Sequence, residues 1–143
     1  MKIIIVGAGI CGTAMYHFLH HHLPNPSTHT ITIYEKHRPA TTPTSDTDVF
    51  ESVVGAGIGI QPNGMRVLRS LSPDLRDAII ACGFVVEKMV FKTPGGYEIG
   101  RVYAGDRGDP EEFCLATSRH AVQKCLASAI PEGAVVYLSL IHI

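Results

Sequence analysis

The sequence predicts an α/β fold in which strands and helices alternate around a parallel sheet, and three observations near the N-terminus predict it. The run from Ile3 to Val6 is apolar and β-branched, as in a strand that is buried on both faces of a parallel sheet. Residues Thr13 to Leu23 have the apolar spacing of a helix, which Pro24 ends. Thr30 to Tyr34 is a second β-branched run. Strand, helix and strand in this order predict a βαβ unit, whose two strands lie side by side.

The rest of the chain predicts further elements of both kinds. A β-hairpin is expected over residues 84–103, because the strand-like runs Phe84–Phe91 and Tyr97–Tyr103 flank a Thr-Pro-Gly-Gly turn. The other expected elements are helices over Met65–Leu71 and Arg119–Ile130 and short strands over Phe113–Ala116 and Val135–Leu138.

Length and composition exclude several classes of protein. The chain has 143 residues, which is one domain or one piece of a larger one. With 45% hydrophobic and 17% charged residues, it is too apolar for a disordered tail and too poor in charge for a coiled coil. The formal charge of −1 argues against a protein that binds the phosphate backbone of nucleic acids.

Cysteine and histidine usage predicts a reducing, cytoplasmic location and no metal site. The cysteines are irregularly spaced, and no two form a C-x-x-C pair, which favours reduced thiols. The three adjacent histidines His20–His22 would point in different directions on a helix, so they do not form a ligand set. No apolar run reaches the length of about 18 residues that a membrane span needs, and glycines interrupt the N-terminal run too early for a signal peptide.

A glycine-rich sequence follows the first strand and is the strongest functional signal. Its residues are Gly7, Ala8, Gly9, Ile10, Cys11 and Gly12, which form a G-x-G-x-x-G sequence. Gly7 permits a tight turn from strand to helix, Gly9 lets a pyrophosphate approach the backbone, and Gly12 lets the helix pack closely on the strand. The helix N-terminus offers unpaired N–H groups to phosphates.

An acidic residue completes this nucleotide-binding pattern. Glu35 ends the second strand, twenty-three residues after Gly12, where a carboxylate accepts hydrogen bonds from ribose hydroxyls. An acid at this position disfavours a 2′-phosphate and therefore favours FAD or NAD over NADP. The alternative is a glycine-rich turn that binds no ligand.

A second group of glycines lies in the middle of the chain. Residues 55–64 have the sequence Gly-Ala-Gly-Ile-Gly-Ile-Gln-Pro-Asn-Gly, with three glycines at alternate positions. This spacing indicates backbone that passes close to a bulky group. A flexible loop before the helix that starts near Met65 explains it equally well.

Taken together, these segments resemble one protein family over about residues 1–138. They are similar to the N-terminal part of the FAD-dependent aromatic hydroxylases, which are single-component flavoprotein monooxygenases of the p-hydroxybenzoate and salicylate hydroxylase type. The segments that carry the resemblance are Ile3–Gly12, Ile33–Glu35, Gly55–Gly64 and Thr117–Arg119. The resemblance implies a Rossmann-like FAD-binding fold, with the predicted hairpin belonging to a sheet on the substrate side.

The resemblance also implies which residues contact the cofactor. The glycine-rich sequence and Glu35 would hold the pyrophosphate and the adenosine ribose, and Arg119 would contact the phosphate and ribityl region. For Arg119 the alternative is a surface arginine, since the helix dipole disfavours a cation at a helix start. The implied FAD-binding residues are Gly7, Ala8, Gly9, Ile10, Cys11, Gly12, Glu35, Lys36, Gly57, Ile58, Gly59 and Arg119.

Some features depart from the family. The residues before the second glycine segment, 51–54, include no arginine to pair with FAD, and Tyr16 stands where a small residue is common. The later Asp-Gly and Gly-Asp motifs of the family are not found, and Leu138–Ile143 has the sequence of an interrupted strand. We therefore expect an incomplete FAD-binding domain over residues 1–143, about the first third of a larger flavoprotein.

The activity that the resemblance implies is flavin-dependent hydroxylation of a small aromatic substrate. NAD(P)H would act as a transient electron donor, and a flavin C4a-hydroperoxide would transfer one oxygen atom of O₂ to the ring. No residue is assigned a catalytic role, since the spacing of the histidines marks none of them as a base. The alternatives are a non-catalytic module that binds FAD or another nucleotide and a small NAD-binding Rossmann protein.

Overall fold

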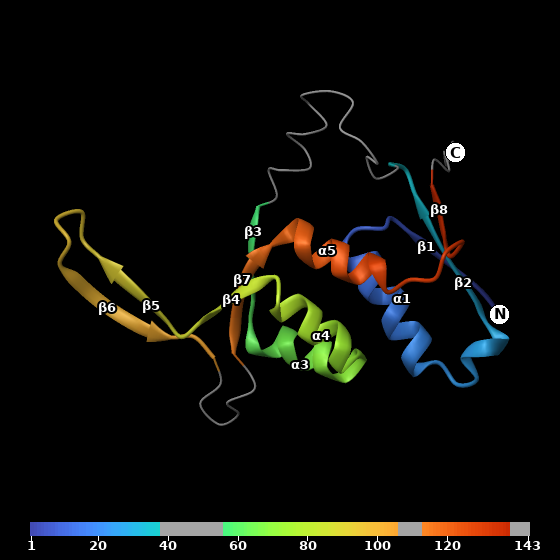
Figure 1. Cartoon of the computed structure of the whole chain (residues 1–143), viewed down its shortest axis with the longest axis horizontal. Coiled ribbons are helices and arrows are strands. Elements are labelled where there is room, and N and C mark those ends of the chain that lie inside the picture. Colours follow the sequence, from blue (N-terminus) through green and yellow to red (C-terminus); the bar gives the residue numbers. More distant parts are fainter. Residues whose placement is uncertain (38–55, 106–112, 138–143) are drawn as a thin grey trace. The chain divides into compact units, whose positions relative to one another are not determined.

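The computed structural model describes residues 1–37, 56–105 and 113–137 of the chain (Figure 1). They belong to two compact units. Unit 1 comprises Met1–Ala56 and Arg119–Ile143, and unit 2 comprises Gly57–Ser118. Each unit is described by itself below.

Unit 1 contains the predicted βαβ arrangement. Its strands are β1 (Lys2–Val6), β2 (Thr30–Glu35) and β8 (Val135–Tyr137), and its helices are α1 (Ile10–His22), the short 3-10 helix η1 (Pro26–Thr28) and α5 (Arg119–Ser128). The strands form a parallel sheet in the order β1-β2-β8. In the register of β1 and β2, Ile5 lies opposite Ile33. The carboxyl ends of β1 and β2 therefore lie next to each other.

The core of unit 1 lies between α1 and one face of this sheet. Ile33 of β2 is fully buried, and it packs with Ala8 of the loop after β1 and with Tyr16 of α1. Ile5 and Ile31 complete this cluster from the sheet. Tyr16 thus fills the space between helix and sheet, at the position where the sequence departs from the family.

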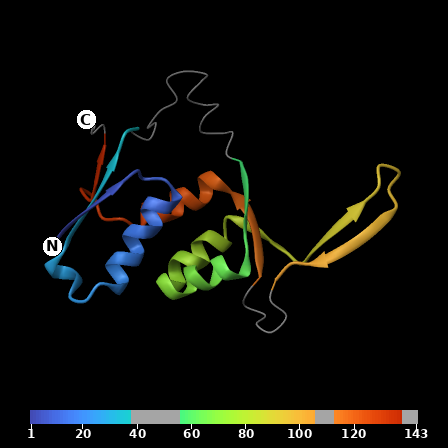
Figure 2. The same cartoon turned by 180° about the vertical axis from the view of Figure 1, so that it is seen from behind.

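Helix α5 packs beside α1 in unit 1, as both views of the ribbon show (Figure 1 and Figure 2). A hydrogen bond joins the two helices, between His17 Nε2 of α1 and the Leu126 carbonyl of α5 at 2.8 Å. The N–H of Arg119, the first residue of α5, donates to the Ala56 carbonyl at 3.0 Å. The contact between His17 and Leu126 ties a segment late in the chain to the N-terminal βαβ unit.

Unit 2 is built from an antiparallel sheet, two helices and a hairpin. Its elements are β3 (Gly57–Ile60), α3 (Pro62–Leu71), α4 (Pro73–Ile80), β4 (Gly83–Val86), β5 (Lys88–Lys92), β6 (Glu98–Tyr103) and β7 (Cys114–Ser118). Strand β7 lies between β3 and β4 and pairs antiparallel with both. Among the described residues of this unit, the largest fully buried side chains are Met65, Ile79 and Leu115, one each from α3, α4 and β7. Strands β5 and β6 pair with each other.

The predicted α/β fold with a βαβ N-terminus is confirmed, and several boundaries are corrected. The hairpin covers residues 88–103, because Gly83–Val86 pairs with β7 and so belongs to the other sheet. Residues 57–60 form a strand, although their glycines were equally consistent with a loop. Helix α5 ends at Ser128, two residues before the predicted Ile130. The predicted strand segment at Leu138–Ile143 lies outside the described residues, as do residues 51–54.

Helix α4 is an element that the sequence analysis missed. Ser72 begins it, and its hydroxyl accepts a hydrogen bond from the Leu75 N–H at 3.3 Å. Pro73 occupies the first helical position, where proline is favoured. Serine before proline at a helix start is a local signal that could have found this helix.

Within the described residues, no helix has both the length and the apolar character needed to cross a membrane.

Candidate dinucleotide-binding site

The glycine loop connects β1 to α1 by a tight turn at Gly7. This residue has a φ of +94°, in the region that only glycine adopts readily. Its N–H donates to the Tyr34 carbonyl at 2.7 Å, which continues the pairing of β1 and β2 by one residue. The turn therefore leaves the sheet at the carboxyl ends of its strands, where ligands bind in open α/β sheets.

Gly9 and Gly12 differ in what surrounds them. A Cβ atom at Gly12 would overlap the carbonyl oxygen of Gly7 and would lie 3.4 Å from Ile5 Cγ2, so Gly12 allows α1 to pack against the strand. A Cβ atom at Gly9 would meet no protein atom within 4 Å. The space over Gly9 is thus open to a ligand that approaches the backbone.

The N-terminus of α1 presents donors that no side chain caps. Gly9 is the N-cap residue and has no side chain to accept from the first turn, which also contains no acidic residue. The buried Thr13 hydroxyl donates to the carbonyls of Gly9 at 2.9 Å and Ile10 at 3.1 Å, away from the N–H groups of that turn. Unpaired N–H groups and the positive end of the helix dipole favour an anion here.

Glu35 lies beside the glycine loop at the end of β2. Its Oε2 accepts a hydrogen bond from the Ala8 N–H at 2.5 Å, and its Oε1 accepts one from the His37 N–H at 2.9 Å. Burial raises the pKa of the Glu35 carboxyl, but the N–H donors of His37 and Ala8 outweigh it and leave the pKa below its ordinary value. The side chain is 20% exposed, so a charged acceptor faces solvent at this site.

Gln123 of α5 is part of this arrangement and was missed by the sequence analysis. Its Nε2 donates to the Ala8 carbonyl at 3.1 Å across 115 residues of sequence. Arg119 lies one helical turn before Gln123, so both project from the same face of α5. A glutamine inside a helix carries no local signal for such a contact, and only the pairing of α5 with α1 brings it to the loop.

The predicted FAD-binding residues fall into two groups in the structure. In unit 1, the loop of residues 7–12 lies beside Glu35, which the exposed Lys36 follows. Arg119, the first residue of α5, belongs to the same unit. The exposed Cys11 lies in the first turn of α1, next to the half-buried Ile10. Gly57, Ile58 and Gly59 belong to strand β3 of unit 2, and their implied part in binding FAD stays a prediction.

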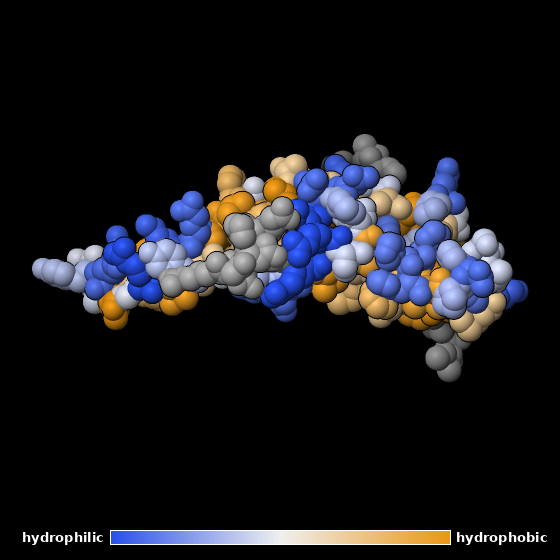
Figure 3. Space-filling view, turned by 90° about the horizontal axis from the view of Figure 1, so that it is seen from below, coloured by the Kyte–Doolittle hydropathy of each residue, from blue (hydrophilic) through white to orange (hydrophobic). Residues whose placement is uncertain are grey.

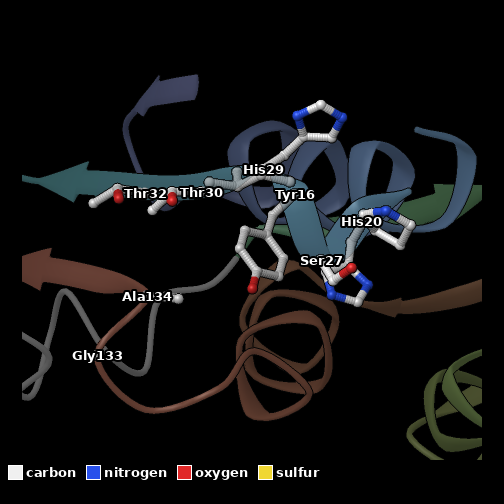
Figure 4. A pocket seen from close by; sticks show the side chains of 10 residues that line it. Tyr16, His20, Ser27, His29, Thr30, Thr32, Gly133 and Ala134 are labelled. Atoms are coloured by element: carbon white, nitrogen blue, oxygen red, sulfur yellow. The ribbon is translucent and has the colours of Figure 1, made fainter. Parts of the chain in front are cut away.

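A separate cavity of about 350 Å³ lies in unit 1 at the opposite end of the strands. Figure 4 shows its lining by Tyr16 and His20 of α1, by Thr30 and Thr32 early in β2, and by the turn before β8. The amino ends of parallel strands are not where α/β sheets bind nucleotides. This cavity is therefore distinct from the candidate site.

The residues of unit 1 fit a dinucleotide. The open space at Gly9 leaves room for a pyrophosphate. The uncapped N-terminus of α1 offers N–H donors to it, and the ionised Glu35 offers acceptors to ribose hydroxyls. Arg119 is exposed at the first residue of α5, and its contact with the phosphates stays a prediction. Among the residues that the structure describes, no group of three or more histidine, cysteine or acidic side chains is arranged to hold a metal ion.

Comparison with known proteins gives the class of this fold. The chain has the fold of FAD-dependent monooxygenases over 96% of its length. HpxO of Klebsiella pneumoniae, in complex with FAD and uric acid, matches with a TM-score of 0.67 at 19% identity, over 31% of its own chain. The p-nitrophenol 4-monooxygenase PnpA of Pseudomonas putida matches with a TM-score of 0.66 at 13% identity, over 32% of its own chain. The α/β FAD-binding fold predicted from the sequence is thereby confirmed.

One curated protein is similar in sequence as well. The chain is 36% identical over 101 residues to 3-amino-4-hydroxybenzoate 2-monooxygenase of Streptomyces cremeus, which covers 63% of this chain and 24% of that protein. The chain therefore spans about a quarter of the length of this relative. No family model matches the chain. The predicted resemblance to aromatic monooxygenases is confirmed in sequence by this relative, and the solved structures confirm the FAD-binding fold.

Proposed function

We propose that this chain binds FAD through unit 1 and is the dinucleotide-binding part of a flavoprotein monooxygenase that acts on a small aromatic substrate. The observation that carries the proposal is the glycine loop, whose Ala8 N–H is bound by the Glu35 carboxylate at 2.5 Å beside the uncapped end of α1. The similarity to an aminohydroxybenzoate monooxygenase and to a p-nitrophenol monooxygenase supports the aromatic substrate. We propose NAD(P)H as the electron donor, O₂ as co-substrate and a cytoplasmic location.

Each side chain has a physical role in this proposal. The first-turn N–H groups of α1 would donate to the pyrophosphate, and Glu35 would accept from the adenosine ribose. Arg119 would offset phosphate charge from the start of α5. FAD supplies the redox chemistry when bound, while the protein supplies binding and orientation.

A nucleotide-binding test separates this proposal from a small NAD-binding protein. The purified chain is titrated with FAD, NAD and NADP, and binding is followed by calorimetry and by flavin fluorescence. The proposal expects saturable, stoichiometric binding of FAD and much weaker binding of NADP, because Glu35 repels a 2′-phosphate. Tight binding of NAD without binding of FAD would overturn it.

A turnover test separates a monooxygenase from a binding module. The FAD-loaded chain is supplied with NADH or NADPH, O₂ and a panel of hydroxybenzoates, aminohydroxybenzoates and nitrophenols, and hydroxylated product is measured. A monooxygenase gives product that depends on the aromatic substrate. Product shows that the chain turns over by itself. Stoichiometric FAD binding without product shows either that the chain needs further parts of a larger enzyme or that it is the alternative, a nucleotide-binding module without turnover.

A further inference from the structure

One backbone segment of the glycine loop is held from two sides by side chains that lie far apart in the sequence. Glu35 of β2 accepts from the Ala8 N–H at 2.5 Å, and Gln123 of α5 donates to the Ala8 carbonyl at 3.1 Å. Ala8 itself is buried, with 8% of its surface exposed. The two peptide groups that flank Ala8 are therefore both fixed by side-chain hydrogen bonds.

The contact from Gln123 has a consequence for the next residue. In a planar trans peptide the C=O and the following N–H point in opposite directions. Because Gln123 holds the Ala8 carbonyl toward α5, it also directs the Gly9 N–H away from α5. A Cβ atom at Gly9 would meet no protein atom within 4 Å, so the Gly9 backbone lies next to open space.

We propose that Gln123 is a positioning residue that sets the orientation of the Ala8–Gly9 peptide for binding the pyrophosphate of a dinucleotide. The inference rests on the proposed function and extends it to a residue outside the glycine loop, Glu35 and Arg119. With Glu35 on one side and Gln123 on the other, the loop is organised before the ligand arrives, which lowers the cost of ordering it on binding. Gln123 contacts the loop and acts on the ligand through it.

Helix α5 provides its own control for this proposal. Three residues after Gln123, the Leu126 carbonyl contacts His17 Nε2 of α1 at 2.8 Å. This second contact also joins α5 to the N-terminal βαβ unit, but it touches α1 at a distance from the glycine loop. A variant at His17 therefore loosens the packing of α5 and leaves the Ala8 carbonyl bonded.

The test compares Gln123→Met, which keeps the size of the side chain and removes the donor, with His17→Ala. ADP is the probe, and its affinity is measured by calorimetry at a temperature where thermal unfolding shows each variant to be folded. Gln123→Met is expected to weaken ADP binding by roughly 3- to 10-fold, the loss of one hydrogen bond, and to shift the Gly9 amide resonance of the free protein. His17→Ala is expected to change the affinity by less than about 2-fold. Gln123→Ala serves as a second variant should Gln123→Met fail to fold.

The outcomes separate this inference from the proposed function. Unchanged affinity in Gln123→Met, or equal losses in Gln123→Met and His17→Ala, overturns the positioning role and leaves dinucleotide binding in place. Failure of the wild-type chain to bind ADP or FAD overturns the proposed function, and the positioning role falls with it.

Discussion

Gly9 and Gly12 of the glycine-rich sequence are suited to glycine for different physical reasons. At Gly12 the space is filled by the Gly7 carbonyl and the Ile5 side chain, whereas at Gly9 it is empty. A methyl group at Gly12 would therefore disturb the packing of the protein. A methyl group at Gly9 would instead occupy the space that we propose for a ligand. The sequence motif marks both positions, but only the structure separates these two roles.

We predict opposite phenotypes for the two alanine variants. Gly12→Ala should lower the free energy of unfolding by about 1–3 kcal/mol, because the helix must move away from the strand. Gly9 has a φ of −71°, which alanine adopts without strain, so Gly9→Ala should change stability by less than about 1 kcal/mol. Gly9→Ala should nevertheless weaken ADP binding by about tenfold or more. Urea unfolding and calorimetry measure both effects, and equal stability losses in the two variants would contradict the account.

Glu35 links the stability of the loop to pH. The pKa of its carboxyl lies below the ordinary value in the folded protein, despite burial, because the N–H groups of His37 and Ala8 favour the ionised form. The unfolded chain therefore binds the proton more tightly, and stability rises with pH through this range. The stability that the ionised Glu35 contributes is fully present above the ordinary pKa of glutamate. It is lost as the pH falls through the lower pKa of Glu35 in the folded protein.

The predicted result is a difference in pH dependence between two proteins. The unfolding midpoint of the wild-type chain should fall between about pH 5 and pH 3, and that of Glu35→Gln should fall less over the same range. Thermal unfolding followed by circular dichroism at a series of pH values measures this. Parallel curves for the two proteins would show that Glu35 is not held as an anion by the loop.

Elements with a clear apolar period could be predicted from the sequence, and elements whose identity depends on tertiary pairing could not. The β-branched runs of β1 and β2 and the intervening helix predict the βαβ unit, with β1 and β2 as neighbours. Strand β3 has alternate glycines, which have low strand propensity, and it forms because it pairs with β7. Residues 84–86 are strand-like, as the hairpin strands that follow are, yet they pair with β7 and not within the hairpin.

The same limit applies to the candidate site. The G-x-G-x-x-G sequence and Glu35 follow from local chemistry, since each residue type suits its position in a βαβ unit. The contact of Gln123 with Ala8 depends on how α5 packs beside α1, and no local pattern encodes it. Residues supplied by a distant helix are therefore the part of this site that sequence reasoning did not find.

The β5–β6 hairpin should be the least protected element of unit 2. Its two strands pair with each other, and Met89, Phe91 and Val102 on them are 45–53% exposed. A two-stranded hairpin in water is marginally stable, whereas β7 is paired on both sides and carries the buried Leu115.

Hydrogen exchange measures this difference in protection. Amides of residues 88–92 and 98–103 should exchange at least about tenfold faster than those of residues 114–118, because opening the hairpin does not require the sheet around β7 to open. The helices α3 and α4 provide a reference within the same unit. Protection of the hairpin equal to that of β7 would show that another surface covers it.

Apolar side chains that lie on the surface of the described residues have consequences for the whole molecule. Ile4 and Val6 of β1 are 65% and 70% exposed, and Phe84, Tyr97 and Ile99 of unit 2 are 71–80% exposed. Figure 3 shows apolar surface interspersed with hydrophilic surface on one face. Exposed apolar surface of this kind favours association. Part of the 45% hydrophobic content of the chain therefore lies on the surface and not in the core.

We predict that the isolated chain self-associates at high concentration. Sedimentation velocity should show a rising average mass as the concentration increases, and a double variant with Ile4→Thr and Val6→Thr should shift this rise to higher concentration. Threonine keeps the β-branched shape that suits a strand while reducing the apolar surface. A chain that stays monomeric and fully soluble at high concentration would contradict this prediction.

The central claim is that unit 1 binds FAD at the loop between β1 and α1, and amide chemical shifts on addition of FAD test it most directly. The account predicts saturable shifts at residues 7–12, at Glu35 and Lys36, and around Arg119 and Gln123, with no change in the hairpin of residues 88–103. Saturable FAD binding that leaves the amides of residues 7–12 unmoved, or the absence of any binding, would contradict it.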